Sequence, residues 1–343
     1  MTLKLSICIP IFNCSEFVGQ ALDSILPQTT SSIEVIIYDG GSTDDTPSLL
    51  EGYLRIWANL QYHRGDHRGG IDIDMATCAS FAQGEYIWLF SGDDVMRPDA
   101  IIRALKQIES GDDIYICSHT ICNKNMTIFR THPVLSPNRY TSADLSDPIL
   151  RLKWFQSAVT TEAFFSFMSG LIVRRAKWQS GLLPDDFKHS CWGHVARFFG
   201  LIQNELHVVY VADIWLDQRG GNDSFADKGI VNRYRIAIDG YHKVADTYFG
   251  VGSEEAFHIR RVIRNEFGLR RFLSARYLCN KYPQHESRDL LDQLLLKAYC
   301  DNPIRDGVMR FAYRLPIWDY RMIQFIGRSI IFITRTLKRI GNA

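Results

Sequence analysis

The chain has 343 residues, enough for one large domain or two ordinary ones, and its 46% hydrophobic and 22% charged content is typical of a globular protein and excludes a disordered one. A formal net charge of +1 gives no overall attraction to nucleic acid, and no stretch has the roughly 18–20 uninterrupted apolar residues of a membrane span. The eight cysteines form no CxxC pair and no His/Cys cluster with zinc spacing, so we expect reduced thiols in a cytosolic protein without a signal peptide.

The first elements alternate between strand and helix. Residues 5–10 predict a buried strand that stops at Pro10, and apolar residues at helical spacing then continue until Pro27. Residues 33–38 predict a second strand, followed by a glycine-rich turn and a helix that starts near Pro47. This alternation predicts a parallel sheet with right-handed crossovers.

The second strand ends in Asp39, at the sheet edge where open α/β proteins bind ligands. Gly40 and Gly41 follow, and they allow a ligand to come close to the backbone. The chain contains neither a GxGxxG fingerprint nor a GxxxxGK[ST] phosphate loop. An ordinary strand-to-helix turn, with Ser42 or Thr43 as the N-cap, explains the same residues equally well.

A further buried strand is predicted over residues 86–90, because this run is short, aromatic-rich and uninterrupted. Ser91 and Gly92 end it, so Asp93 and Asp94 stand at its carboxyl end. Two such carboxylates can hold Mg²⁺ or Mn²⁺ against a phosphate. The alternative is a turn that caps the next helix.

Taken together, these motifs resemble the successive signatures of family 2 glycosyltransferases. The matching segments are residues 10–13 (Pro-Ile-Phe-Asn), 38–44 (Tyr-Asp-Gly-Gly-Ser-Thr-Asp), 84–94 and Pro98-Asp99. The resemblance is strong over about residues 3–110 and weaker to about residue 225. It implies an α/β protein with the GT-A fold, a Rossmann-like mixed sheet, together with a nucleotide-sugar donor, an Mn²⁺ or Mg²⁺ cofactor and inversion at the anomeric carbon.

Three other segments resemble the abequosyltransferases and related O-antigen enzymes within that family: residues 69–74, 190–195 and 219–222. The subgroup implies transfer of a hexose, with a dideoxy hexose as one form, in lipopolysaccharide O-antigen synthesis. The donor would be CDP-, UDP-, GDP- or dTDP-linked. The acceptor would be a polyprenyl-diphosphate-linked oligosaccharide.

The resemblance also assigns roles to individual residues. Pro10 and Phe12 would line the base site, Asp39 would accept a hydrogen bond from the base, and Asp93 would bind the metal with Asp94 beside it. The rest of the expected nucleotide-sugar site comprises Asn13, Arg68, Asp72, Asp74, Ser91 and Gly92. Arg68 belongs to a basic, glycine-rich loop and could clamp the diphosphate, although a surface role stays open.

The chain departs from the family pattern at the metal site. Ser91 stands where the first acid of the Asp-x-Asp element is usual, and Gly40 replaces the second acid of the usual Asp-Asp pair. Asp72 or Asp74, which we place in a loop before the next helix, could complete the metal site. Each could equally lie in a solvated turn or cap a helix.

Inverting transfer also needs a general base on the acceptor hydroxyl. The acids expected in the second half of the domain align with Ser190, Cys191 and Gly193, so the usual base is missing. His194 is the substitute that we prefer, because an imidazole has a suitable pKa, and Asp186 is the second choice. A packed or capping histidine is the plainer interpretation.

In the second half of the domain, short apolar runs predict the remaining strands. Residues 114–118, 164–174 and 208–211 predict strands, and residues 124–150 predict an exposed connection. After the last strand, Arg219 lies in a glycine-rich loop that could close over the donor and stabilise the leaving diphosphate. A plain exposed turn is the alternative.

We expect a glycosyltransferase domain over residues 1–225, with a nucleotide-binding half (1–112) and an acceptor half (113–225), and a basic helical region over residues 226–343. The last segment, residues 317–340, mixes apolar and basic side chains in a way that suits an anionic membrane surface. A bundle with a solvated basic face explains it equally well. The expected location is the cytoplasm or the cytoplasmic face of the inner membrane.

Two other functions compete with glycosyl transfer. A nucleotidyltransferase normally has a basic, glycine-rich loop behind its first strand, and residues 11–14 (Ile-Phe-Asn-Cys) have neither feature. A catalytically weak nucleotide- or sugar-binding module fits Ser91, Gly40 and the missing acidic base.

Overall fold

The computed structural model describes residues 3–136, 141–222 and 228–315. The chain forms two compact units. The first comprises Met1–Asp223 and Lys243–Val262, and the second comprises Ser224–His242 and Ile263–Ala343. Residues 243–262 therefore belong with the first unit, an arrangement that the sequence pattern alone does not show.

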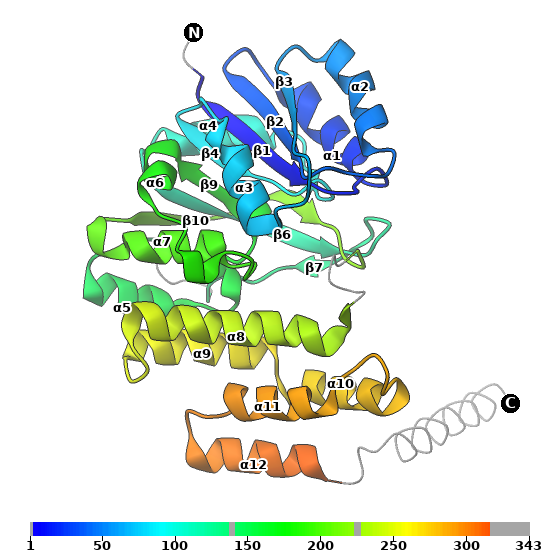
Figure 1. Cartoon of the computed structure of the whole chain (residues 1–343). Helices are drawn as coiled ribbons and strands as arrows, with labels where there is room; N and C mark the ends of the chain where they lie inside the picture. Colours follow the sequence, from blue (N-terminus) through cyan, green and yellow to red (C-terminus); the bar gives the residue numbers. More distant parts are fainter. Residues whose placement is uncertain (1–2, 137–140, 223–227, 316–343) are drawn as a thin grey trace, which may run out of the picture. The chain divides into compact units, whose positions relative to one another are not determined.

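One mixed sheet organises the first unit, with the strand order β3-β2-β1-β4-β9-β6-β10-β5 (Figure 1). Its strands are β1 (Leu5–Ile11), β2 (Ile33–Asp39), β3 (Leu60–Arg64), β4 (Tyr86–Leu89), β5 (Val95–Met96), β6 (Ile114–Cys122), β7 (Ile128–Thr131), β8 (Ser142–Asp144), β9 (Leu171–Arg174) and β10 (His207–Gln218). β3, β2, β1 and β4 run parallel, whereas β9 is antiparallel to both β4 and β6. The predicted Rossmann-like mixed sheet is confirmed.

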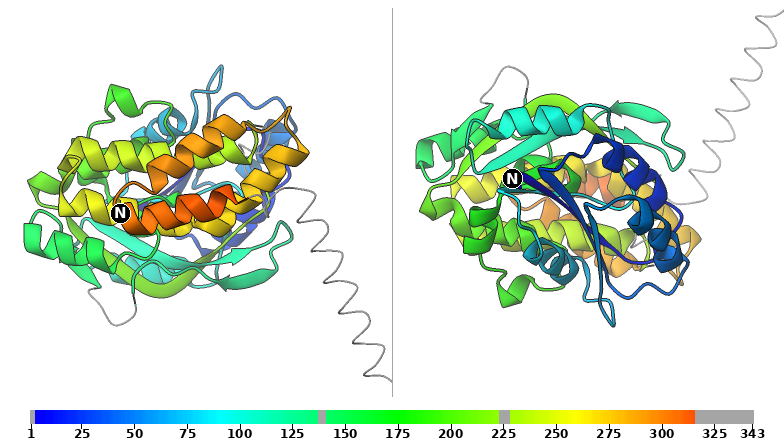
Figure 2. Two further views of the ribbon diagram at one scale, coloured as in Figure 1. Left: turned by 90° about the horizontal axis from the view of Figure 1, so that it is seen from below. Right: turned by 90° about the horizontal axis from the view of Figure 1, so that it is seen from above.

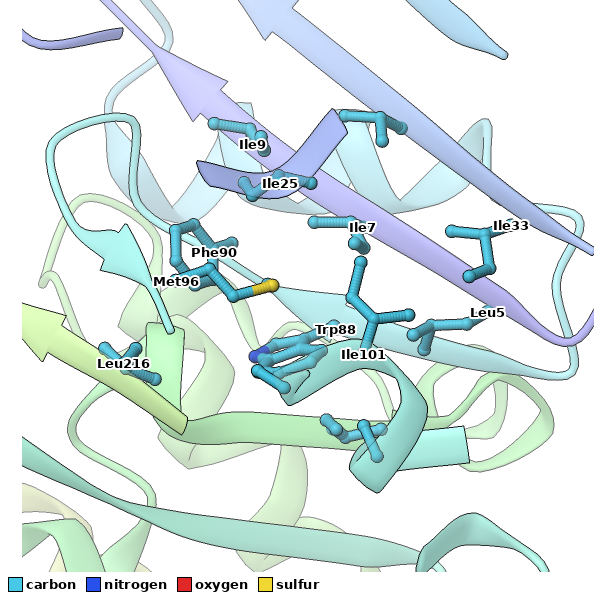
Figure 3. Packing of buried hydrophobic residues seen from close by; sticks show 14 of the residues in the cluster. Leu5, Ile7, Ile9, Ile25, Ile33, Trp88, Phe90, Met96, Ile101 and Leu216 are labelled. Carbon is cyan, nitrogen blue, oxygen red and sulfur yellow. The ribbon is translucent and has the colours of Figure 1, made fainter. Parts of the chain in front are cut away.

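Alternation along β1 shows how the sheet is covered. Ile7 and Ile9 belong to a core that also contains buried residues of α1 (Val18–Ile25), α2 (Thr46–Ile56) and α4 (Ala100–Ile108) (Figure 3). Cys8 points the other way, and its Sγ approaches the Cys78 carbonyl of α3 (Ile71–Ser80). Helices therefore cover both faces of the strands, as Figure 2 also shows. This arrangement explains why β1 is apolar on both sides.

Several predicted boundaries were wrong. β1 continues through Pro10, which is in register with Tyr38 of β2. On its other side β1 pairs with β4 only as far as Cys8, so the missing N–H of Pro10 disrupts no hydrogen bond between these two strands. The expected strand over residues 164–174 is confined to β9, and it is preceded by two short 3-10 turns, η2 (Thr161–Phe164) and η3 (Met168–Gly170).

The second half of the sheet also holds more strand than we predicted. The expected exposed connection over residues 124–150 contains β7 and β8, and β10 extends well beyond residues 208–211. β7 is exposed along its whole length and β8 has only three residues, so neither contains the buried apolar run by which we predicted strands. The remaining elements of this half are α5 (Pro148–Ser157), α6 (Arg175–Ser180), η4 (Asp185–Phe187), α7 (Gly193–Leu201) and η5 (Ile202–Asn204).

The C-terminal region is helical, as predicted, through α8 (Ile230–Phe249), α9 (Glu254–Glu266), α10 (Leu269–Lys281), α11 (Arg288–Ala298) and α12 (Pro303–Arg314). Some of its arginines are buried and bind other residues of the region, so they do not contribute to an exposed basic face. Arg264 pairs with Asp301 at 2.5 Å with both side chains buried, and the guanidinium of Arg276 lies over the Tyr313 ring. Residues 317–340 lie outside the described residues. Within the described chain, no helix has the length and apolarity to cross a bilayer.

Candidate active site

Three loops meet at the carboxyl edge of the parallel strands. The loop after β1 is bonded to the loop after β2 through the Asn13 backbone N–H, which donates to Ser42 Oγ at 2.8 Å. It is bonded to the loop after β4 through Cys14 Sγ, which lies 3.4 Å from the Gly92 carbonyl oxygen. The segments that carry Asn13, Asp39 and Asp93 are therefore neighbours, as the parallel order requires.

Asp39 ends β2 with its side chain fully buried. Its Oδ1 accepts bonds from the Ser42 backbone N–H (2.7 Å) and hydroxyl (2.6 Å), and its Oδ2 accepts one from the Tyr62 hydroxyl at 2.8 Å. Arg64 Nε is 3.8 Å from Oδ2. Both oxygens thus have partners in the chain, so a bond to a nucleotide base would have to be added to this network or replace part of it.

Phe12 and Asn13 lie in the loop after β1. The exposed Arg68 lies over the Phe12 ring, with its guanidinium carbon 4.6 Å from the ring centroid. The side-chain oxygen of Asn13 accepts a 2.8 Å bond from the Thr43 N–H. The structure thus brings Arg68 to the predicted base-binding loop, whereas the buried Pro10 lies inside the sheet.

Asp74 explains why residue 40 is glycine. A Cβ at Gly40 would lie 2.9 Å from Asp74 Oδ2, so the carboxylate fills the space of a side chain there. Asp74 Oδ1 accepts a 3.1 Å bond from the Gly69 N–H. Burial raises the pKa of Asp74. Asp74 is in the first turn of α3 rather than in the loop that we predicted, and it supplies a carboxylate beside β2.

The hydrogen bonds of the Asp72 side chain give it a structural role. Its Oδ2 accepts from the Cys191 N–H and its Oδ1 accepts from the Gly193 N–H, both at 2.8 Å. These donors lie at the start of α7, so the buried carboxylate caps that helix from α3. The predicted alternative of a helix cap is what the geometry supports, although the cap belongs to a helix far away in sequence.

Asp93 is the half-buried carboxylate at the end of β4. Ser91 Oγ donates to its Oδ1, and Asn222 Nδ2 donates to its Oδ2. A half-turn of the Asn222 amide would present an oxygen instead. Carboxylate, hydroxyl and amide oxygens are the hard ligands that Mg²⁺ and Mn²⁺ bind, so this donor set fits the expected cation.

Asp94 is buried and faces protein rather than solvent. Its Oδ2 accepts a 2.6 Å bond from Ser169 Oγ, and its Oδ1 accepts a 2.9 Å bond from the Arg219 N–H. Burial, reinforced by the neighbouring Asp93, raises the pKa of Asp94 well above its ordinary value. These contacts make Asp94 an anchor for the segment after β10, and direct metal binding by Asp94, as predicted, would require them to break.

Arg219 is buried and its guanidinium is fully engaged. Nε donates to the Asp93 carbonyl at 2.7 Å, and the two terminal nitrogens donate to the Lys124 carbonyl and to Gln20 Oε1, each at 2.5 Å. Arg219 therefore holds the Asp93 loop in place. Direct contact with a diphosphate, as predicted, would require these bonds to break.

The two candidate bases have opposite surroundings. His194 is buried in the first turn of α7, and its Nε2 lies 2.9 Å from the Phe165 carbonyl oxygen. Among the described residues its Nδ1 has no hydrogen-bond partner. Burial lowers the pKa of His194, so the ring is neutral at neutral pH and Nδ1 can accept a proton. Asp186 is exposed on η4.

Sequence reasoning missed several residues of this site. Asn222 lies in the segment 219–222 that resembles the abequosyltransferases, but we predicted no role for it, and Ser169 lies in a segment that we predicted to be strand. His189, which has a positive φ of 63°, lies beside Gly70: its Nδ1 is 3.6 Å from the position of a Cβ on that glycine.

Solved structures of nucleotide-sugar enzymes share this fold. One is TarS residues 1–349 of S. aureus in complex with UDP-GlcNAc, at a TM-score of 0.58 and 14% identity, covering 95% of this chain and 92% of that one. Another is the mannosyltransferase PcManGT of Pyrobaculum calidifontis in complex with GDP-Man and Mn²⁺, at a TM-score of 0.53 and 15% identity, covering 91% and 85%. The fold of this chain is the GT-A fold.

The family follows from sequence comparison. Residues 6–168 match the family model for glycosyl transferase family 2. Abequosyltransferase RfbV of Salmonella typhimurium is 25% identical over 326 residues, covering 90% of this chain and 94% of that protein. Hyaluronan synthase of Pasteurella multocida is 36% identical over 124 residues, 36% of this chain and 12% of that protein. The chain therefore contains a glycosyl transferase family 2 domain over residues 6–168.

Proposed function

We propose that this glycosyltransferase transfers a hexose, with inversion, from a nucleoside-diphosphate sugar to a lipid-linked oligosaccharide in the synthesis of a surface polysaccharide. The observation that carries the proposal is the oxygen cluster of Asp93, Ser91 and Asn222 at the edge where the loops after β1, β2 and β4 meet. This edge is where parallel sheets present ligand-binding groups.

The donor diphosphate would bind at this cluster. Asp93, Ser91 and Asn222 would hold Mn²⁺ or Mg²⁺, which neutralises the charge that develops on the leaving nucleoside diphosphate. Arg219 keeps the Asp93 backbone in position through its bond to the carbonyl oxygen. Gly92 allows the loop to pass close to Ile11, because a Cβ there would lie 2.6 Å from the Ile11 side chain.

The nucleoside would lie along the loop after β1. Phe12 would stack on the base, and the Asp39 network would read its polar edge. Arg68 is exposed and rests on Phe12, so it can move to the diphosphate when a base takes its place on the ring. A substitution of Arg68 would then weaken donor binding with little effect on folding.

The acceptor hydroxyl would be activated by His194, whose Nδ1 has no hydrogen-bond partner within residues 3–136, 141–222 and 228–315 and can accept a proton. Its burial requires the acceptor to enter beside α7. Asp186 is the exposed alternative. His194→Gln and Asp186→Asn separate the two, because only loss of the base lowers turnover while donor affinity is kept.

The sugar and the acceptor are proposed from the similarity to abequosyltransferase RfbV, which extends over 90% of this chain. A hexose donor, in dideoxy form as one option, and a polyprenyl-diphosphate-linked acceptor fit that relationship. A lipid-linked acceptor would also place the protein on the cytoplasmic face of a membrane, with the basic C-terminal region as the contact.

The test is a thermal-shift screen of CDP-, UDP-, GDP- and dTDP-sugars with Mn²⁺, followed by a turnover assay with the donor that raises the melting temperature most. A ligand at 100 times its Kd stabilises the native state by about 2.7 kcal/mol. We expect one base to stand out and to support metal-dependent release of nucleoside diphosphate. Binding without turnover, in the presence of acceptor, would contradict the proposal.

A further inference from the structure

A second group of metal-ligating side chains, in the half of the domain where we expect the acceptor, shares no residue with the cluster around Asp93. His119 belongs to β6, His132 follows β7, and Glu162 belongs to η2. One ligand atom from each lies within 4.8 Å of the others, and His132 Nε2 is 2.8 Å from Glu162 Oε2. The two imidazoles are stacked, with centroids 4.9 Å apart and planes 24° from parallel. Three segments distant in sequence thus converge on one point.

Within the described residues, the ring nitrogens of the two histidines lack most of the hydrogen bonds that they could form. His119 is fully buried, and among the described residues neither of its ring nitrogens has a hydrogen bond of good geometry. The Nδ1 of His132 is also buried and has no hydrogen-bond partner in the part of the chain that the structure describes. Burial of a polar group without a hydrogen bond is unfavourable, so such groups call for an explanation.

Burial also keeps His119 in the form that metals bind. Desolvation lowers the pKa of its imidazole to about 4, although Glu162 and Gln218 oppose the shift. The His132 hydrogen bond offsets the effect of burial on Glu162, and the pKa of this carboxyl is lowered. The shifted pKa values thus favour neutral imidazole at His119 and ionised carboxylate at Glu162, the ligand forms that a divalent cation requires.

We propose that His119, His132 and Glu162 bind a transition-metal ion of the Zn²⁺ class, distinct from the Mn²⁺ or Mg²⁺ expected at Asp93. Two imidazoles and one carboxylate form a zinc site with an open fourth position. Neighbouring ligand atoms of a tetrahedral zinc stand about 3.3 Å apart, a spacing between the 2.8 Å and 4.8 Å found here. Only a small adjustment of side chains is needed.

The two sites differ in donor chemistry. Asp93 is surrounded by oxygen donors, whereas imidazole nitrogen favours Zn²⁺ over Mn²⁺ and Mg²⁺. His132 and Glu162 are each 14% exposed, so the fourth ligand would come from that partly open side. The same chain would therefore select different ions at its two sites.

The site would stiffen a segment that serves the candidate active site. Glu162 begins a stretch whose Phe165 carbonyl binds His194 and whose Ser169 hydroxyl binds Asp94. The Phe167 ring, in the same stretch, lies 4.3 Å from the His119 ring. A metal ion at Glu162 would anchor this stretch to β6 and keep both contacts in place.

The experiment uses the full chain, stripped with a chelator and titrated with Co²⁺, whose visible absorption is strong only in four-coordinate sites. We expect one intense Co²⁺ spectrum per chain, abolished by stoichiometric Zn²⁺ and retained in Asp93→Ala. His119→Leu and Glu162→Gln should each weaken this binding by at least about 100-fold, more than the loss of an outer partner does. His285→Leu, which removes an exposed histidine, should leave it unchanged.

Stability separates metal binding from a purely structural role. If His119 is a ligand, metal-free His119→Leu should be at least as stable as the metal-free parent, because the substitution replaces a buried polar group by an apolar one. Zn²⁺ should then no longer raise the melting temperature of the variant. No four-coordinate Co²⁺ spectrum, equal binding by His119→Leu, or loss of the spectrum in Asp93→Ala would each overturn the proposal.

Discussion

Asp72 provides a sharp test of how the two halves of the domain are joined. Its carboxylate is buried, and each oxygen accepts a 2.8 Å bond from a backbone N–H at the start of α7. Asp72→Ala removes both bonds and leaves the Cys191 and Gly193 donors without their acceptor. The helix also loses a negative charge at its positive end.

The magnitude follows from these contacts. Hydrogen bonds to a charged group contribute about 1.5–3 kcal/mol each, and loss of a helix cap costs about 0.5–2 kcal/mol. Because the two bonds are coupled and water can enter the space, their contributions do not add fully. We expect Asp72→Ala to lower the free energy of unfolding by about 2–4 kcal/mol without metal present.

Urea unfolding followed by circular dichroism measures this change, and Mn²⁺ titration measures metal affinity in the same samples. Asp66→Ala, which removes an exposed carboxylate from the loop before α3, is the matched control and should stay within about 0.5 kcal/mol of the parent. Unchanged stability of Asp72→Ala together with weakened Mn²⁺ binding would refute the capping role and favour Asp72 as a metal ligand.

Three further predictions follow from single contacts. Gly40→Ala should destabilise the protein by about 1–3 kcal/mol because its Cβ would meet Asp74 Oδ2 at 2.9 Å, and the Gly40→Ala/Asp74→Ala double variant should recover part of that loss in urea unfolding. The pKa of His194 is lowered in the folded protein, so below about pH 6.5 the unfolded state binds more protons than the folded state. The free energy of unfolding should therefore fall as the pH falls, by up to about 1.4 kcal/mol per pH unit. His194→Gln should show a flatter dependence of this free energy on pH between pH 7 and 5. Arg219→Lys should keep the charge but lose most of the three side-chain bonds, and should weaken Mn²⁺-dependent donor binding more than it lowers the melting temperature; the reverse ranking would contradict its positioning role.

The parallel half of the fold could be predicted because its signals are local. β1, β2 and β4 are short, largely apolar runs, and parallel order alone brings Asp39 and Asp93, which end or follow two of them, to one edge. The second half could not be predicted in the same way. β7 is exposed throughout, and residues 164–170 (Phe-Phe-Ser-Phe-Met-Ser-Gly), which include η3, are rich enough in apolar residues to be indistinguishable from a strand by composition.

The candidate site could likewise be predicted only in part. Residue type and position identified Asp93 as a metal-binding candidate, but the partners that give each acid its role come from distant segments. Asp94 differs from Asp93 because Ser169 and Arg219 bury it, and Asp72 differs from Asp74 because α7 begins beside it. The group of His119, His132 and Glu162 has no sequence spacing that reveals it, since it forms only when three separate segments pack together.

The most direct test of the account is calorimetric titration of CDP, UDP, GDP and dTDP into the protein with and without Mn²⁺, in the parent and in Asp93→Asn. That substitution keeps the shape of the side chain and removes its charge. We predict tight, Mn²⁺-dependent binding of one diphosphate to the parent and at least about 100-fold weaker binding to the variant, a difference of about 2.7 kcal/mol. Equal, metal-dependent affinity in both proteins would show that the ion and the diphosphate bind elsewhere.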